Sequence, residues 1–308
     1  MEARIYKSTG SWYTAKGEDG KFYQARAKGV FKIEGITSTN PIAVGDKVIM
    51  EPEEGSADTA IITEILPRHN YIARQSPSHK RQHHIVAANI DQSFLICTIR
   101  DPRTSQGFID RFLVGSEAFH VPAVLVFNKK DIYKEKDLEQ FFRLKDVYEN
   151  IGYPVKLVSA DKEEGMEELH EMMKGKTTLF SGHSGVGKSS LINKIIPGLN
   201  LRTKNISGWS GKGLHTTTFA EMFDLPYGGS IIDTPGVREF GVIDIEKREL
   251  SHYFPEMRAL IHDCQFNNCI HVNEPGCSVL AALERSEIDV ERYVSYLRIM
   301  DTIEENNY

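Results

Sequence analysis

Short runs of alternating apolar and polar residues fill the first part of the chain, and turn residues separate them. β-Branched and aromatic side chains are frequent in these runs, which have the length of strands. Five runs stand out, at residues 4–7, 11–14, 21–26, 44–50 and 60–66. Five short strands fit a small closed barrel, so residues 1–67 are predicted to form a barrel similar to an OB-fold.

From residue 85 the pattern changes to apolar runs that alternate with amphipathic segments. The runs are expected to be strands at residues 93–99, 122–127, 155–158, 176–180, 219–223 and 230–233. The amphipathic segments are expected to be helices at residues 108–120, 136–151, 166–174 and 190–196. This alternation predicts a parallel, doubly wound α/β sheet. Ligands of such sheets bind beyond the carboxyl ends of the strands.

A basic segment joins these two regions. Residues 67–84 hold four Lys or Arg and four His but no acidic residue, together with Pro and Ser. This composition is typical of a mobile tether, and contact with a phosphate backbone is the alternative interpretation. Residues 68–90 are therefore predicted to be a basic linker, and the sequence alone favours neither role.

The barrel is a candidate nucleic-acid surface, because OB-folds commonly bind through exposed aromatic and basic side chains. The net charge of the chain is −6, so such binding would need local basic patches. The candidate side chains are Trp12, Tyr13, Phe22, Tyr23, Arg26 and Lys28. The alternative is that the rings fill the core of the barrel.

A glycine-rich loop between a predicted strand and a predicted helix reads G-x-x-x-x-G-K-S, the pattern of a phosphate-binding P-loop. Its backbone N–H groups would converge on phosphate oxygens. Lys188 would reach the β- and γ-phosphates, the Ser189 hydroxyl would hold Mg²⁺, and Ser190 would contact the α-phosphate. The predicted phosphate-binding residues are Gly182, His183, Ser184, Gly185, Val186, Gly187, Lys188, Ser189 and Ser190.

Two other predicted strands end in residues that suit a guanine base. An N-K-x-D match follows the first, and a Ser-Ala pair follows the second. The carboxylate of Asp131 would accept hydrogen bonds from guanine N1–H and the 2-amino group, a donor pair that adenine lacks. Asn128 would brace the loop, Lys129 would cover the ring, and the Ala160 N–H would meet O6. The predicted base-binding residues are Asn128, Lys129, Lys130, Asp131, Ser159 and Ala160.

A D-x-x-G match follows the last predicted strand. Asp233 would hold Mg²⁺ through water, and the Gly236 N–H would contact the γ-phosphate. The Gly- and Ser-rich residues 208–218 are typical of a switch loop that becomes ordered on γ-phosphate and Mg²⁺. Thr217 is predicted to complete the Mg²⁺ shell; the alternative is that the three threonines begin a β-branched strand.

Three of the four cysteines lie near one histidine at the end of the chain. Cys264, Cys269, His271 and Cys277 offer four soft or borderline ligands, which predicts a structural, tetrahedral Zn²⁺ site. Free thiols beside a chance histidine are the alternative. Residues 246–260 and 279–303 are expected to be helical, so residues 243–308 are predicted to form a helical domain stapled by zinc.

No run of the chain reaches the length of a membrane span. The first residues lack the apolar core of a secretory signal. A cytoplasmic protein without a membrane partner is therefore expected, and a monomer is the predicted state.

The nucleotide motifs together resemble those of the translation-factor-related GTPases, but their order is changed. Asn128–Asp131 and Ser159 precede Gly182, whereas the P-loop usually comes first. This is the order of a circularly permuted GTPase, which is physically allowed because domain termini often lie close together. With the leading barrel and the trailing cysteines, the whole chain resembles the circularly permuted, ribosome small-subunit-dependent GTPases.

This resemblance implies a multidomain fold: the OB-like barrel, a permuted α/β P-loop GTPase domain over residues 68–242, and the helical zinc domain. It also implies a function in late maturation of the small ribosomal subunit. The protein would bind the subunit and its rRNA, and it would hydrolyse GTP to GDP and phosphate with stimulation by the subunit.

Catalysis needs a group that orients water. Many GTPases place Gln directly after D-x-x-G, but Val237 stands here and cannot hydrogen-bond. His215 is the candidate, and the resemblance implies the same; the alternative is a solvated loop histidine. Two other functions stay open on the residues alone, an ATP-dependent RNA remodeller and an RNA-binding module with a vestigial nucleotide site.

Overall fold

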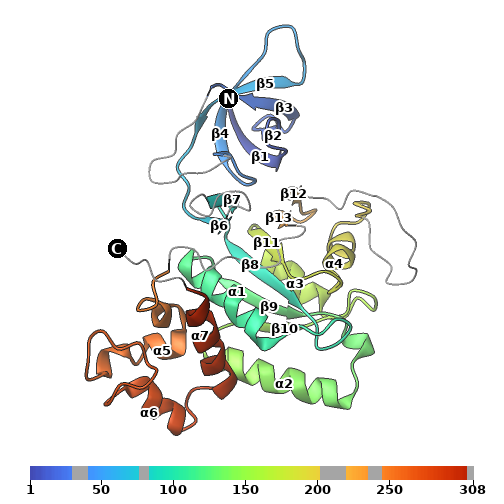
Figure 1. Ribbon diagram of the computed structural model, residues 1–308. Helices are drawn as coiled ribbons and strands as arrows, with labels where there is room; N and C mark the ends of the chain where they lie inside the picture. Colours follow the sequence, from blue (N-terminus) through green and yellow to red (C-terminus); the bar gives the residue numbers. More distant parts are fainter. Residues whose placement is uncertain (30–40, 76–82, 202–219, 235–244, 304–308) are drawn as a thin grey trace, which may run out of the picture.

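The computed structural model of the chain describes residues 1–29, 41–75, 83–201, 220–234 and 245–303. These residues form three parts: a barrel that contains the N-terminus, a central sheet flanked by helices, and a C-terminal group of short helices (Figure 1). Among the described helices, none combines the length and the apolar composition that a membrane crossing requires.

The barrel consists of five strands, as the alternating pattern predicts. They are β1 (Glu2–Ser8), β2 (Tyr13–Gly17), β3 (Phe22–Ala27), β4 (Lys47–Pro52) and β5 (Thr59–Ile65). The strand order is β1-β2-β3-β5-β4, and β4 pairs back with β1, so the sheet closes. Every second side chain of β2, such as Tyr13 and Ala15, enters the core because successive residues point to opposite faces.

The segment predicted as a linker is partly a β-hairpin. Strand β6 (Tyr71–Gln75) pairs antiparallel with β7 (His83–Ala88), so the tether interpretation is wrong for these residues. Arg68 is also held, because two of its nitrogens each lie 2.6 Å from a carboxylate oxygen of the buried Asp46. The basic residues Lys80 and Arg81 lie outside the described residues.

The central sheet has six strands. They are β8 (Gln92–Cys97), β9 (Ala123–Phe127), β10 (Val155–Leu157), β11 (Thr177–Ser181), β12 (Glu221–Asp224) and β13 (Ser230–Asp233). Their order is β10-β9-β8-β11-β13-β12, and the first five are parallel. The prediction of a parallel strand is wrong for β12, which runs antiparallel to β13. A tight turn closed by the Leu225 N–H and the Gly229 carbonyl joins them, too short for a parallel crossover.

Helices cover both faces of this sheet, as a doubly wound fold requires. They are α1 (Gln106–Ala118), α2 (Glu135–Asn150), α3 (Met166–Met173) and α4 (Lys188–Ile195). Leu95 and Cys97 of β8 belong to the apolar cluster that α1 and α2 complete. Phe94 and Ile96 of the same strand belong to the cluster with α3 and α4. Strand β8 is buried on both faces, which explains its continuous apolar run.

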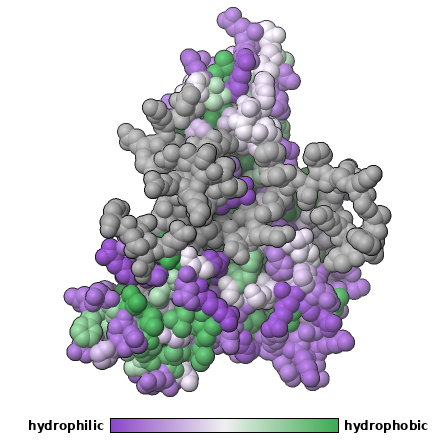
Figure 2. Space-filling view, viewed as in Figure 1, coloured by the Kyte–Doolittle hydropathy of each residue, from purple (hydrophilic) through white to green (hydrophobic). Residues whose placement is uncertain are grey.

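The C-terminal part is built from shorter helices than the sequence predicts. They are the 3-10 helices η2 (Leu250–Tyr253) and η3 (Ile261–Asp263), and the α-helices α5 (Pro255–Arg258), α6 (Ser278–Glu284) and α7 (Val290–Thr302). The expected single helix over residues 279–303 is interrupted because Ser286 has a positive φ and Asp289 caps a new helix by accepting from the Arg292 N–H. Figure 2 shows apolar residues gathered on the surface of this part, at the lower left.

Barrel and central sheet are continuous. Strand β1 pairs antiparallel with β12, and Lys7 stands opposite Glu221. Next to this junction the backbone of Gly45 approaches the hairpin so closely that a Cβ atom would lie 2.1 Å from the carbonyl oxygen of Ala88. The barrel is therefore docked on the central domain through backbone contacts as well as side chains.

Candidate functional site

Three loops and the end of β13 meet at the carboxyl edge of the central sheet. The predicted phosphate loop follows β11 and leads into α4. The N-K-x-D residues follow β9 and run into the 3-10 helix η1 (Lys130–Ile132), the Ser-Ala pair follows β10, and Asp233 ends β13. Because these strands run parallel in one sheet, motifs that are separated in the chain lie along the same edge.

Asn128 joins three of these loops. Its side-chain amide donates to the carbonyl of Val186 in the phosphate loop at 3.0 Å, and its side-chain oxygen accepts from the Ala160 N–H at 3.1 Å. The side chain is buried. A Cβ at Gly187 would lie 2.4 Å from the Asn128 amide nitrogen, so this contact requires glycine in the phosphate loop.

The remaining N-K-x-D side chains differ in their surroundings. Asp131 is exposed and accepts a hydrogen bond from the Ser159 hydroxyl, which orients its carboxylate. Lys129 has a left-handed backbone with φ +66°, and its ammonium donates to the carbonyl of Asp101. Lys130 pairs with Glu164 at 2.6 Å. The side chain of Lys130 is thus engaged by another surface group, although its place in the motif suggested a base contact.

The phosphate loop has the backbone that its glycines allow. Gly182, Gly185 and Gly187 all have positive φ values, and the loop delivers the chain to the start of α4 at Lys188. The Lys188 ammonium donates to the Gly182 carbonyl. Burial lowers the pKa of Lys188, and the nearby Asp233 opposes that shift. A partly buried ammonium beside the N-terminus of a helix is a strong site for a phosphate oxygen.

The side chain of His183 contacts two other residues of the protein. Its Nε2 lies 2.8 Å from the hydroxyl of Thr104, and its ring packs edge-on against Phe108 with 5.4 Å between ring centroids. Both partners lie at the start of α1, about 80 residues away in the chain. No local sequence signal marks Thr104 or Phe108, so sequence reasoning missed this support of the loop.

Asp233 is a buried carboxylate with an unused oxygen. Burial raises its pKa to about 6, although Lys188 acts in the opposite direction. Its Oδ1 atom has no hydrogen-bond partner among the described residues. A buried, unpaired carboxylate oxygen beside the phosphate loop fits a hydrated divalent cation. The predicted residues His215, Thr217 and Gly236 lie outside the described residues, as does Val237.

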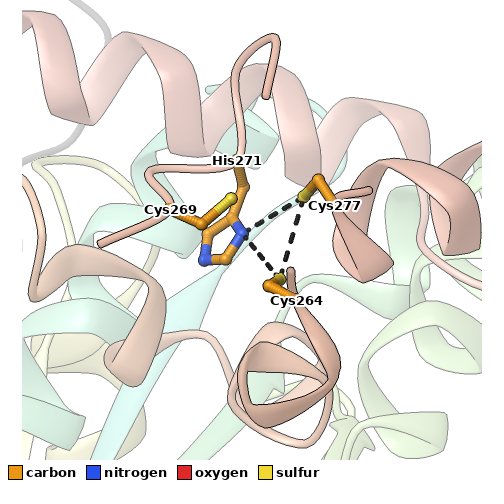
Figure 3. A group of neighbouring side chains, drawn as sticks. All are labelled: Cys264, Cys269, His271 and Cys277. Atoms are coloured by element: carbon orange, nitrogen blue, oxygen red, sulfur yellow. Dashed lines mark hydrogen bonds between the residues drawn. The ribbon is translucent and has the colours of Figure 1, made fainter. Parts of the chain in front are cut away.

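The four residues of the cysteine cluster point toward one another (Figure 3). Their ligand atoms all lie within 4.8 Å of one another. His271 Nδ1 stands 3.6 Å from Cys264 Sγ and 3.3 Å from Cys277 Sγ, and the two sulfurs are 4.0 Å apart. Ligands about 2.3 Å from a central Zn²⁺ stand about 3.7 Å from each other in a tetrahedron, so the spacing fits zinc.

The backbone around this cluster is tied to α7. Tyr293 donates to the carbonyl of His271 at 2.8 Å, and Tyr296 donates to the carbonyl of Ile270 at 2.7 Å. Cys277 caps α6 by accepting from the Leu280 N–H. The arrangement leaves the cluster without an open ligand position among the described residues, which is typical of structural metal sites.

On the barrel, the predicted aromatic candidates divide into two groups. Tyr13 and Tyr23 are buried in the core, as the alternative interpretation had it. Trp12 and Phe22 are 45% and 52% exposed. Arg26 lies over the ring of Trp12, so an exposed aromatic and a basic side chain are adjacent on this surface.

Known proteins resemble the chain along its whole length. Residues 65–243 match the RsgA GTPase family and residues 2–61 match the RsgA N-terminal domain. Two relatives, from Christiangramia forsetii and Flavobacterium johnsoniae, are each called a small ribosomal subunit biogenesis GTPase. The first is 50% identical and covers 100% of this chain and 98% of its own length. The second is 52% identical and covers 99% of this chain and 94% of its own length.

Two solved structures share the fold. YjeQ from Thermotoga maritima superposes with a TM-score of 0.78 at 35% identity, covering 97% of both chains. YloQ, described as a circularly permuted GTPase, superposes with a TM-score of 0.72 at 29% identity, covering 97% of this chain and 93% of its own.

Proposed function

The chain belongs to the RsgA GTPase family, and from this premise we propose that it hydrolyses GTP to GDP and phosphate in late maturation of the small ribosomal subunit. It binds the subunit and its rRNA, which stimulate hydrolysis. The relatives are named for biogenesis of this subunit. A cytoplasmic location and a monomeric state remain predictions.

One observation carries the nucleotide part of this proposal. The buried Asn128 amide hydrogen-bonds the phosphate loop on one side and the Ser-Ala loop on the other. Asp131 and Lys188 therefore follow strands at the same edge of the sheet, which supports a single guanine nucleotide bound by both. Circular permutation changes the order of the motifs but leaves this geometry intact.

Each of these residues has a separate role in the proposed site. The N–H groups of Gly185 to Ser190 and the Lys188 ammonium would hold the phosphates, while Asp131 selects the base. Ser189 and Asp233 would hold Mg²⁺, which neutralises charge on the β- and γ-phosphates when bound. We propose His215, and not Val237, for orienting the attacking water, with Thr217 and Gly236 at the γ-phosphate.

The test of the proposed activity is GTP turnover by the full-length protein, alone and with purified small ribosomal subunits. We expect slow release of phosphate without subunits and at least about tenfold faster release with them, because a partner that docks the switch loop supplies the catalytic geometry. Equal rates with and without subunits would contradict subunit stimulation.

His215→Ala separates catalysis from binding in the same assay. We expect stimulated turnover to fall to the unstimulated rate while GDP affinity stays within about twofold, because the imidazole is assigned to water and not to the nucleotide. Unchanged stimulated turnover would remove His215 from the mechanism.

Asp131→Asn tests the choice of base. An amide at this position can donate to the 2-oxo group of xanthine, so the variant should lose GDP affinity and gain xanthosine diphosphate affinity. Binding of each nucleotide is measured by calorimetry. An ATP-dependent remodeller would instead bind adenine nucleotides in the wild type and respond little to this substitution.

We further propose that the cysteine cluster holds a structural Zn²⁺ ion. Elemental analysis is expected to find about one zinc per chain. Cys264→Ser should lower the metal content and the unfolding temperature together, whereas Cys97→Ser, at the buried thiol of β8, should keep the metal. Metal content that is unchanged in Cys264→Ser would contradict the assignment.

A further inference from the structure

Tyr133 follows the N-K-x-D residues and reaches back to them. Its hydroxyl donates to the backbone carbonyl of Asn128 at 2.7 Å and accepts from the backbone N–H of Ile99 at 2.9 Å. Asn128 lies just beyond β9 and Ile99 just beyond β8, which are neighbouring parallel strands. One phenol therefore joins the ends of two strands at the edge that carries the candidate nucleotide site.

The backbone of Tyr133 closes the same turn from its other end. Its N–H donates to the Lys130 carbonyl at 3.1 Å, where the 3-10 helix η1 ends. The turn that carries Asp131 is thus held at both ends by one residue, through the hydroxyl at Asn128 and through the N–H at Lys130. The same turn is also held by the Lys130 N–H, which donates to the Val158 carbonyl at 3.1 Å, while the exposed side chain of Asp131 accepts from the Ser159 hydroxyl.

The ring of Tyr133 is partly buried against the apolar cluster that β8, β9, α1 and α2 form. Burial raises the pKa of Tyr133, so the hydroxyl stays protonated and can donate a hydrogen bond throughout the physiological pH range. A rigid ring anchored in the core supplies a fixed point from which the loop is held.

We propose that Tyr133 is a positioning residue for guanine selectivity: it holds the N-K-x-D turn so that the Asp131 carboxylate meets N1–H and the 2-amino group together. The proposal rests on the proposed guanine site. The hydroxyl is used by Asn128 and Ile99, so it acts through the turn and does not contact the nucleotide.

Tyr133→Phe tests this directly, because it keeps the ring and removes the hydroxyl. It leaves the Asn128 carbonyl and the Ile99 N–H without their partner. We expect the dissociation constant of GDP to rise about tenfold, a factor typical of losing one or two such hydrogen bonds. Inosine diphosphate lacks the 2-amino group and makes one bond fewer to Asp131, so its affinity should fall less.

The deciding quantity is the ratio of the dissociation constants for inosine diphosphate and GDP, measured by calorimetry with Mg²⁺. It is expected to fall at least about threefold in Tyr133→Phe, since one hydrogen bond to guanine is lost selectively. Tyr153→Phe is the matched control: its hydroxyl donates to Glu117 at 3.0 Å in the same domain. The ratio should stay at the wild-type value in this control.

A double variant shows whether the effect passes through Asp131. In the Asp131→Asn background, Tyr133→Phe should leave the ratio unchanged, because the carboxylate that it positions is gone. An unchanged ratio in Tyr133→Phe, or an equal fall in Tyr153→Phe, would overturn the inference while wild type still prefers GDP. A wild type without preference for GDP would overturn the proposed guanine site as well.

Discussion

At the scale of single residues, Glu274 shows how backbone groups control a carboxylate. It lies in the turn between His271 and Cys277 and accepts from the N–H groups of Ile270, Val272 and Asn273 at 2.8 to 3.1 Å. Burial alone would raise its pKa, but these N–H groups outweigh burial and lower the pKa to about 2. The ionised carboxylate therefore holds together the loop that carries two candidate metal ligands.

Glu274→Gln is expected to lower the free energy of unfolding by about 1–2 kcal/mol near neutral pH, after allowing for solvent screening of a partly exposed group. A carboxyl whose folded pKa is depressed stabilises the protein above its unfolded pKa, and this contribution disappears as pH falls toward 2. The difference between wild type and variant should therefore be constant above pH 5 and shrink below about pH 4.5. Urea unfolding at several pH values measures it.

The control for this variant is Glu284→Gln, at an exposed glutamate of α6. It should change the free energy of unfolding by less than about 0.5 kcal/mol at every pH. A loss of unfolding free energy in Glu274→Gln that does not depend on pH would show that the charge of Glu274 is not the stabilising feature.

At the scale of secondary-structure elements, α7 is fastened to α1 by a buried ion network. Arg292 of α7 is 1% exposed and pairs with Asp110 of α1 at 2.8 Å and with Glu256 of α5 at 2.7 Å. Tyr148 of α2 also donates to Asp110. Burial raises the pKa of Asp110, and Arg292 opposes this shift. The C-terminal helices therefore pack against the GTPase domain through buried ion pairs, in which each charge is compensated by its partner.

Arg292→Met is expected to lower the free energy of unfolding by about 3–5 kcal/mol, because it leaves two buried carboxylates without their partner. Arg285→Met removes an exposed pair with Glu287 and should cost far less, because water already screens that pair. Chemical unfolding followed by tyrosine fluorescence and circular dichroism compares the two. Equal losses in both variants would mean that the network contributes little to docking of α7.

At the scale of the whole molecule, the barrel is joined to the GTPase domain by backbone contacts. Strand β1 pairs with β12 and so extends the central sheet. Strand β12 forms a hairpin with β13, and β13 ends at Asp233. Gly45 donates to the Ile5 carbonyl at 2.8 Å and passes close to the hairpin at Ala88. The orientation of the barrel therefore depends on a close approach that a side chain would prevent.

Gly45→Ala should destabilise this junction. Gly45 and Gly20 both have positive φ, +91° and +79°, so alanine at either position pays a similar backbone cost. A Cβ at Gly20 meets nothing within 4 Å, whereas at Gly45 it would clash with Ala88. Thermal unfolding is expected to show a loss at least about 2 kcal/mol larger for Gly45→Ala than for Gly20→Ala. Small-angle scattering should show a larger radius of gyration for Gly45→Ala than for Gly20→Ala. Equal stability and equal radius in the two variants would contradict the role of this contact.

Local patterns in the sequence were enough to predict most elements and the chemistry of the loops. Strand β8 and helix α2 follow from the spacing of apolar residues, and the P-loop, the N-K-x-D match and the cysteine cluster each lie within a short stretch. A short stretch carries such information because backbone conformation and ligand spacing depend on nearby residues. The changed order of the motifs also predicts a circular permutation, because it is read from the sequence alone.

Tertiary structure alone decided the contacts between distant segments. It made β12 antiparallel, turned part of the predicted linker into a hairpin, and divided the barrel aromatics between core and surface. It also paired Asp110 with Arg292, which are 182 residues apart, and brought Thr104 to His183. A periodic pattern tells which face of an element is buried but not what it is buried against, since that depends on how the other elements pack around it.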